Sequence, residues 1–500
     1  MDILQVLSSY KNSQKTAMIC NEDSITYQEL WEESDFLASY IKEKLGNDKT
    51  PIIVYGHKNP KMLVAFLGCV KSGRAYVPID VTVPRNRVEA IIDSLCPKLI
   101  ITTESFDKYK DYHTFNIITD DYKTCVNTKI CCEDYVKSED IYYIIFTSGS
   151  TGVPKGVQIS YSALNNFTSW ALSLGSNEKQ NKTFINQAPF SFDLSVMDLY
   201  MSLASESCLY CLEKTIQTNY KSLFESLCKS NANVWVSTPS FADLCLADKS
   251  FNQDLLQNIE LFLFCGETLT NKTVEALSLR FPNAEIYNTY GPTESTVAVT
   301  EILVTKEINN KYNPLPVGQV KPGTIIKIMS EGKEMPEGEK GEIVILGNTV
   351  SKGYLNRPEE NAKAFFVYDE NGTTLPAYRT GDKGFFMDGF LFYCGRIDLQ
   401  IKLHGYRMEL EDVEKNLMKV PDVKKAVVLP IYEDGKIKYL KAYCIYGKKI
   451  DSEFKTQKLI KQQMQDFVPD YMIPKKIKFV DNIPMTANGK ADRKRIQEME

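Results

Sequence analysis

Apolar and polar positions alternate along the first two thirds of the chain in a recurring pattern. Short apolar runs predict buried strands at 51–56, 75–80, 98–102, 141–146, 233–237 and 259–264. Runs with helical spacing follow some of these strands, at 59–70, 88–95 and 270–281. The first opens on Asn59 and Pro60, which favour a helix start. Strands that alternate with helices indicate an α/β domain with a largely parallel sheet.

The pattern changes twice toward the C-terminus. From about 314 to 395, short apolar runs are separated by turn signals such as Pro322-Gly323 and Asp388-Gly389, which predict a β-rich subdomain. After Asp398 the order becomes helix, strand, hairpin, strand and helix, typical of a small α+β domain. We therefore expect a large N-terminal domain over 1–397 and a small C-terminal domain over 398–500.

Composition narrows the function classes. The 500 residues carry 59 Lys plus Arg and 64 Asp plus Glu, a net charge of −5, so the basic stripe typical of nucleic-acid binding is not expected. No apolar run approaches the roughly 18 residues of a membrane span, and the first residues lack a secretory pattern. The 13 Cys show no framework spacing, which favours reduced thiols. We expect a cytoplasmic protein that is a monomer and does not insert into a membrane.

One loop indicates phosphate chemistry. Residues 146–156 read FTSGSTGVPKG and combine three glycines with four hydroxyl side chains and Lys155, between an apolar strand and a helical run. Glycines let backbone N–H groups approach an anion, and hydroxyls and lysine add donors. The loop lacks the GK[ST] ending of a Walker A loop. The alternative is a flexible Ser/Gly surface loop, although such linkers rarely join a buried strand to a helix.

This loop resembles the signature loop of the adenylate-forming enzymes, the family of amino-acid adenylation domains, acyl-CoA synthetases and firefly luciferase. Further segments resemble family motifs in the family's order, over nearly the whole chain: GRAYVPID at 73–80, NTYGPTE at 288–294, GEIVILG at 341–347, YRTGD at 378–382, GRIDLQIKLHGYRMELE at 395–411 and PMTANGK at 484–490. The resemblance implies the two-domain fold of that family, with a mobile C-terminal domain, and the use of ATP and Mg²⁺ as cofactors.

The resemblance also assigns roles. It implies that ATP or AMP is bound by Thr147, Ser148, Gly149, Ser150, Thr151, Gly152, Lys155, Asn288, Thr289, Tyr290, Gly291, Pro292, Thr293, Asp382, Tyr393, Cys394, Gly395, Arg396 and Lys490. Among these, Tyr290 would stack on adenine, Thr293 would contact the α-phosphate and Asp382 would accept the ribose hydroxyls. Glu294 would help to hold Mg²⁺, a cation that prefers oxygen ligands. Taken alone, such a Glu is more often solvated and such an Asp is more often a turn residue.

Lys490 is the predicted catalytic residue. In the family this lysine lies between the substrate carboxylate and the α-phosphate, where an ammonium stabilises the negative charge of the transition state. Without the surrounding ANGK motif, it would be read as a surface lysine in a basic tail. The resemblance further implies that the small domain turns about a hinge at Asp398 between two half-reactions.

The stretch FSFDLSVMDLY at 190–200 bears on the substrate. In amino-acid-activating members, an Asp at the position of Asp193 binds the substrate ammonium; the alternative is an ordinary helix-cap or strand Asp. Together with LFCGE at 263–267, the stretch is most similar to the branch that activates D-alanine. There the residues matching Cys265 and Val297 contact the amino acid, and Lys490 contacts its carboxylate.

That branch loads a separate carrier protein through its phosphopantetheine thiol, and the D-alanine then esterifies lipoteichoic acid. The chain ends ten residues after Lys490, which favours such a separate carrier. Another small amino acid remains an alternative substrate. Asp193 argues against an acyl-CoA synthetase, and the presence of Lys490 and Asp382 argues against a silent scaffold.

Overall fold

The computed structural model describes residues 1–106, 113–123, 129–148, 154–433, 435–485 and 491–498. By their contacts these residues form two compact units. The first comprises 1–81, 95–145 and 156–395, and the second comprises 82–94, 146–155 and 396–500. These contact groups do not test a domain boundary at Asp398, which therefore stays a prediction.

Two sheets form the α/β part of the first unit. The larger has nine strands in the order β15-β14-β13-β12-β11-β9-β10-β1-β2, and its five central strands, from β13 to β10, run parallel. Their bounds are β1 Thr16–Cys20, β2 Asp23–Thr26, β9 Thr183–Asn186, β10 Cys208–Cys211, β11 Val234–Ser237, β12 Leu261–Phe264, β13 Glu285–Tyr290, β14 Thr300–Leu303 and β15 Gln319–Val320.

The second sheet has six strands in the order β6-β5-β3-β4-β7-β8. Their bounds are β3 Ile52–Gly56, β4 Tyr76–Asp80, β5 Ile100–Thr102, β6 Thr114–Asn116, β7 Ile141–Thr147 and β8 Lys155–Ser160. The β3 and β4 strands pair in parallel, and all but one of their residues are buried, as the continuous apolar runs predicted.

Helices accompany these sheets along the chain; α4 is grouped by its contacts with the second unit, and the others belong to the first. Their bounds are α1 Ile3–Ser9, α2 Tyr27–Leu45, α3 Pro60–Lys71, α4 Arg85–Leu95, α5 Tyr161–Ala171, α6 Leu194–Ala204, α7 Lys214–Gln217, α8 Tyr220–Ser230, α9 Pro239–Leu246, α10 Asn271–Arg280 and α11 Lys306–Lys311. Thr26 and Glu29 form a reciprocal capping box at the start of α2, and Asn59 caps α3 as its sequence predicted.

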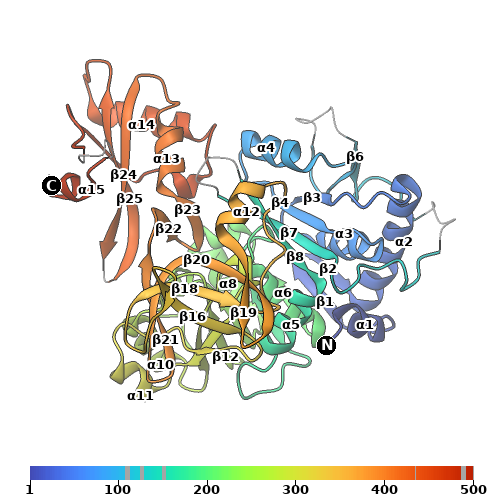
Figure 1. Cartoon of the computed structure of the whole chain (residues 1–500). Coiled ribbons are helices and arrows are strands. Elements are labelled where there is room, and N and C mark those ends of the chain that lie inside the picture. Colours follow the sequence, from blue (N-terminus) through green and yellow to red (C-terminus); the bar gives the residue numbers. More distant parts are fainter. Residues whose placement is uncertain (107–112, 124–128, 149–153, 434, 486–490, 499–500) are drawn as a thin grey trace. The chain divides into compact units, whose positions relative to one another are not determined.

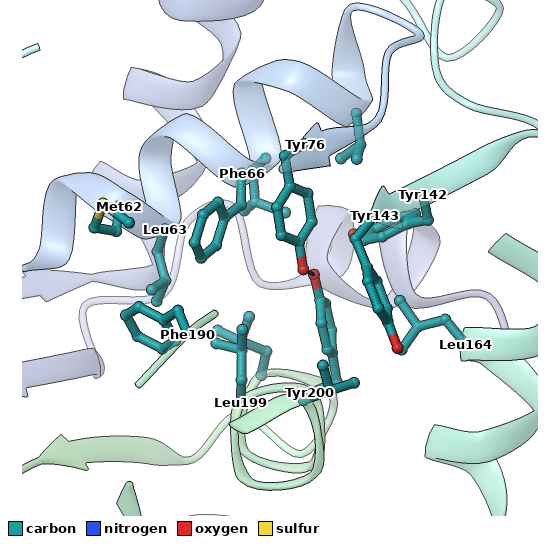
Figure 2. Packing of buried hydrophobic residues seen from close by; sticks show 14 of the residues in the cluster. Met62, Leu63, Phe66, Tyr76, Tyr142, Tyr143, Leu164, Phe190, Leu199 and Tyr200 are labelled. Atoms are coloured by element: carbon teal, nitrogen blue, oxygen red, sulfur yellow. Dashed lines mark hydrogen bonds between the residues drawn. The ribbon is translucent and has the colours of Figure 1, made fainter. Parts of the chain in front are cut away.

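A large apolar core lies between α3, α5 and α6 (Figure 2). The α3 helix is buried on nearly every side and contributes Met62, Leu63 and Phe66. The Tyr76 and Tyr200 hydroxyls meet at 2.8 Å within this core. Because α6 also begins beside Asp193, this packing fixes the helix that carries the predicted substrate residue.

The β-rich part of the first unit is an antiparallel sheet, drawn in yellow and orange in Figure 1. Its elements are β16 Ile325–Ser330, β17 Lys333–Glu334, β18 Gly341–Leu346, α12 Pro358–Ala364, β19 Phe365–Glu370, β20 Thr373–Met387 and β21 Phe390–Arg396. The short strand β15, which lies within the predicted β-rich range, instead pairs with β14 of the nine-stranded sheet.

The second unit has its own core. It contains the hairpin β22 Gln400–Leu403 and β23 Tyr406–Glu409, the sheet of β24 Val423–Glu433, β25 Lys436–Tyr446 and β26 Lys476–Phe479, and the helices α13 Leu410–Leu417, α14 Glu453–Met464 and α15 Arg493–Gln497. Apolar side chains of α13 and α14 pack against this sheet. Within the described ranges of the whole chain, no helix has both the length and the apolar character needed to cross a bilayer.

Candidate active site

The parallel strands of the large sheet bring the predicted substrate residues to one edge. The carboxyl ends of β9, β12 and β13 are neighbours or near neighbours in this sheet, and the segments that follow them carry Asp193, Cys265 and Thr293. In open parallel sheets, ligands bind beyond the carboxyl ends of the strands. The topology therefore brings together residues that lie up to 100 positions apart in the sequence.

Asp193 and Thr293 are in direct contact. The Thr293 hydroxyl donates a 2.6 Å hydrogen bond to Oδ2 of Asp193. Asp193 stands at the N-cap position of α6, but its side chain makes no capping hydrogen bond. The ordinary helix-cap explanation for this residue is therefore wrong, and its half-buried carboxylate faces the NTYGPTE segment instead.

Cys265 and Val297 also meet. The Cys265 thiol lies 3.8 Å from the Val297 carbonyl oxygen, and both side chains are buried. The backbone at Val297 has a φ of 68°, which is uncommon for a β-branched residue. The chain turns sharply here, so that the carbonyl of Val297 is directed toward the end of β12. The roles of Cys265 and Val297 toward a substrate remain predictions.

A second carboxylate–hydroxyl pair lies at the opposite end of the NTYGPTE segment. The Tyr290 hydroxyl donates a 2.6 Å hydrogen bond to Oδ2 of Asp382, and both residues are buried. Burial, and then the Asp382 carboxylate, raise the pKa of Tyr290 well above its ordinary value, so the phenol keeps its proton and remains a donor. The Tyr393 ring lies 5.9 Å from the Tyr290 ring, tilted by 38°.

Asn288 and Thr289, which precede both pairs in the segment, are fixed by hydrogen bonds to backbone carbonyls. Asn288 donates its amide to the Pro316 carbonyl at 2.8 Å, and the Thr289 hydroxyl donates to the Phe264 carbonyl at 2.9 Å. A Cβ on Gly291 would lie 2.6 Å from Cα of Ala298, so only glycine fits there. Pro292 follows, also buried. At least one amide proton of Asn288 is thus already used within the protein.

Glu294 is buried rather than solvated. Its side chain is 1% exposed, and Oε1 accepts a 2.8 Å hydrogen bond from the Tyr354 hydroxyl. No local pattern in the sequence predicts that Tyr354 contacts Glu294, because the two residues lie 60 positions apart. Tyr354 thus contacts a predicted site residue without having been predicted itself.

The second unit holds other predicted residues. Thr147 ends β7, Lys155 begins β8, and the Ser148 hydroxyl donates to the Arg407 carbonyl at 2.9 Å. Arg396 forms two hydrogen bonds with the predicted hinge residue Asp398, at 2.9 and 2.6 Å. Partial burial alone would raise the pKa of Asp398, but the Arg396 guanidinium outweighs it and the pKa is lowered.

Cys394 and Gly395 lie at the end of β21, in the first unit, where Cys394 is exposed and Gly395 has a φ of 98°. Five predicted residues lie outside the described residues: Gly149, Ser150, Thr151, Gly152 and Lys490. No geometry supports or opposes their assigned roles.

Comparison with known proteins defines the class. A model of the family described as AMP-binding enzyme matches residues 7–355, and that of its C-terminal domain matches 412–490. The chain belongs to the AMP-binding enzyme family. The predicted family and the predicted adenylate-forming fold are thereby confirmed.

Curated relatives give a narrower similarity. The chain is 48% identical to the D-alanine–D-alanyl carrier protein ligase of Listeria monocytogenes serotype 4b, over 94% of this chain and 93% of that protein. It is 45% identical to the protein of the same name from Bacillus cereus, over 99% of both.

Solved structures agree on the fold. An NRPS protein containing adenylation and PCP domains has a TM-score of 0.84 at 23% identity, over 100% of this chain and 84% of that one. The Vibrio cholerae adenylation domain AlmE, solved with glycyl-adenosine-5'-phosphate, has a TM-score of 0.81 at 23% identity, over 100% and 96%.

Proposed function

We propose that this chain is an ATP-dependent ligase that activates D-alanine and loads it onto a carrier protein. D-alanine and ATP would give D-alanyl-AMP and pyrophosphate, and the D-alanyl group would then pass to the phosphopantetheine thiol of a separate carrier. This product would supply D-alanine for lipoteichoic acid. Support comes from the near-complete coverage of relatives that bear this name.

The Asp193–Thr293 hydrogen bond carries the proposal at the level of chemistry. An amino acid has an ammonium group that needs an anionic acceptor and a carboxylate that must reach the α-phosphate. Asp193 supplies the acceptor, and a charge-assisted hydrogen bond of this kind contributes about 1.5–3 kcal/mol. A carboxylate accepts several hydrogen bonds, so Asp193 can take the ammonium beside the Thr293 hydroxyl, which is also able to rotate toward the phosphate.

The nucleotide would be held through Asp382. A carboxylate can accept about four hydrogen bonds, so the one from Tyr290 leaves capacity for both ribose hydroxyls. Because Tyr290 keeps its proton, it fixes the orientation of Asp382 before any nucleotide arrives. The other predicted ATP contacts, including Lys155 and Arg396, belong to the same proposal.

Mg²⁺ would be held by Glu294, and the donor set fits this ion. Among the described residues, no three His, Cys, Asp or Glu side chains form a metal-binding group. A single buried carboxylate suits Mg²⁺, which usually keeps water and phosphate oxygens as its other ligands. Bound there, the ion would neutralise charge on the phosphates.

The proposed reaction has two chemical steps. A carboxylate oxygen of D-alanine attacks the α-phosphorus, and the bond from that phosphorus to the bridging oxygen of pyrophosphate breaks. The substrate carboxylate is already ionised at pH 7, so this step needs no general base. Lys490 would stabilise the growing charge on the α-phosphate. The carrier thiolate then attacks the acyl carbon, and AMP leaves.

Carrier loading tests the proposal. The purified chain is incubated with ATP, Mg²⁺, D-alanine and a phosphopantetheinylated D-alanyl carrier protein, and the intact carrier is weighed by mass spectrometry. We expect the carrier to gain one alanyl group. The same carrier without phosphopantetheine serves as the control. If the phosphopantetheinylated carrier gains mass with L-alanine or glycine but not with D-alanine, the proposed substrate is wrong.

A further inference from the structure

A buried polar network lies directly behind the substrate segment, and none of its members belongs to the predicted site. The segment Gln187–Phe192 connects the end of β9 to Asp193. The side chains of Lys58, Asn186 and Asp198 gather around its start, and each is at most 3% exposed. Ionisable residues are almost never buried to this extent without partners, so the network needs an explanation.

Lys58 fixes the start of the segment. Its ammonium donates three hydrogen bonds, to the carbonyl oxygens of Asn186 at 2.9 Å, Gln187 at 2.8 Å and Leu212 at 2.8 Å. An ammonium has three protons, so all of its donors are used. Asn186 and Leu212 lie at the carboxyl ends of the neighbouring strands β9 and β10. Lys58 lies in the loop between β3 and α3, so it connects the sheet that contains β3 to the nine-stranded sheet at this edge.

Gln217 donates to two of the three carbonyl oxygens that Lys58 contacts. Its side-chain amide donates to the Gln187 oxygen at 3.0 Å and to the Leu212 oxygen at 2.7 Å. The Gln187 side chain donates back to Gln217 at 3.1 Å. The first residue of the segment is therefore held by both its main chain and its side chain.

Asp198 ties the start of the segment to its end. It lies on α6, five residues after Asp193, and its carboxyl accepts from the Asn186 amide at 3.0 and 3.2 Å. Burial raises the pKa of Asp198 well above its ordinary value, although Asn186 and the Lys58 ammonium oppose the rise. The Asn186 amide oxygen has no hydrogen-bond partner in the described part of the chain.

We infer that Asn186 and Asp198, held in place by Lys58 and Gln217, are positioning residues for the ammonium site. They fix both ends of the segment 187–193 and so set where the Asp193 carboxylate stands relative to Thr293. A displacement of 1 Å at a reacting group can be costly, so a support of this kind has a direct effect on substrate binding. The inference rests on the proposed function of Asp193.

The main test compares Asp198→Leu with Asp198→Asn. Leucine removes the acceptor of the Asn186 amide, whereas asparagine keeps a carbonyl acceptor in a side chain of nearly the same size. We expect Asp198→Leu to raise the KM for D-alanine about tenfold or more while the KM for ATP changes less than about twofold, and Asp198→Asn to stay near the wild type. A structural role alone would not separate the two KM values.

Two further variants guard against misfolding and general destabilisation. Gln217→Ala changes a half-buried side chain, so it folds even where Asp198→Leu does not, and it should raise the KM for D-alanine in the same direction by a smaller factor. Lys71→Met is the control for the loss of a buried polar side chain. Lys71 is as buried as the residues of the network and lies in the same unit, but it contacts Trp31, Ser34 and Asp35 instead. It should leave both KM values unchanged.

Hydrogen exchange separates this inference from the proposed function, because it requires no turnover. Amides of 187–196 should exchange faster in Asp198→Leu and Gln217→Ala than in the wild type, and no faster in Lys71→Met. Unchanged exchange in this segment, or equal increases in both KM values, overturns the inference. A wild type that turns over another amino acid overturns only the D-alanine assignment, and the KM comparison is then made with that amino acid.

Discussion

Asp193 and Asp382 are alike in one contact and different in their surroundings. Each accepts a 2.6 Å hydrogen bond from a hydroxyl of the NTYGPTE segment, Asp193 from Thr293 and Asp382 from Tyr290. Asp382 is 2% exposed and its partner is a buried phenol, whereas Asp193 is half-buried and its partner is a small hydroxyl.

In the proposed function, this difference lets one segment serve two substrates. The Tyr290–Asp382 pair is rigid, because both members are buried and packed, and this suits a nucleotide that is bound the same way in every cycle. The Thr293 hydroxyl is able to rotate on its own bond, and this suits the proposed amino acid, whose ammonium group arrives at Asp193 and leaves with the aminoacyl group. Substitutions at either end should therefore affect different KM values.

The largest expected effect lies at neither carboxylate. Lys490→Ala should lower the kcat for adenylate formation at least about 10²–10³-fold with little change in either KM, because its charge acts in the transition state. Transfer from supplied D-alanyl-AMP should persist. Lys494→Ala, an exposed lysine of the same basic segment, is the control. If single-turnover assays show both half-reactions falling equally, Lys490 does not divide them.

The next effect is at the amino-acid end. Asp193→Ala should raise the KM for D-alanine about 10–100-fold, the equivalent of one charge-assisted hydrogen bond, and leave the KM for ATP nearly unchanged. Initial rates of pyrophosphate release at varied D-alanine and ATP give both values. A parallel rise in the two constants would remove Asp193 from the ammonium site.

A smaller effect, on the KM for ATP instead of the KM for D-alanine, is expected at the nucleotide end. Tyr290→Phe removes only the hydroxyl that orients Asp382, so the KM for ATP should rise about three- to tenfold, as for the loss of one neutral hydrogen bond. The KM for D-alanine should not change. The same titrations measure both, and a change confined to D-alanine would contradict the assignment of the two ends.

The last prediction concerns stability rather than substrate binding, at the buried Lys71. Burial lowers the pKa of Lys71 to about 7, although Asp35 opposes the shift. Between about pH 7 and its ordinary value of 10.5, the unfolded chain binds more protons at Lys71 than the folded chain does, so this lysine destabilises the fold more as pH falls through that range.

The free energy of unfolding of Lys71→Met, relative to that of the wild type, should therefore be higher at pH 7 than at pH 10. Urea unfolding of both proteins at several pH values measures that difference. A gap that stays constant across pH 7–10 would show that Lys71 keeps an ordinary pKa in the fold.

Local patterns predicted the elements well. The predicted strand at 141–146 is β7 (Ile141–Thr147), and the predicted helix at 270–281 is α10 (Asn271–Arg280). Each depends on neighbouring residues alone. The pairing of β1 with β10, which puts Cys20 opposite Cys211, joins segments 191 positions apart and could not be read from any local pattern.

The site divides in the same way. Asp193, Thr293 and Asp382 were found because they stand in recognisable motifs, and two of these three meet within hydrogen-bond distance. Tyr354 and Asn186 were missed because their roles depend on partners far away in the chain. Asp198 did leave a signal, as the one charged residue within the apolar helix LSVMDLYMSLA, since an acidic residue in such a run must find a buried partner.

The most direct test of the account is the exchange of labelled pyrophosphate into ATP by the purified chain, with D-alanine, L-alanine, glycine and a fatty acid compared in parallel. We predict exchange that depends on Mg²⁺ and is fastest with D-alanine. If no amino acid supports exchange, the chain does not form an aminoacyl adenylate and the account is contradicted.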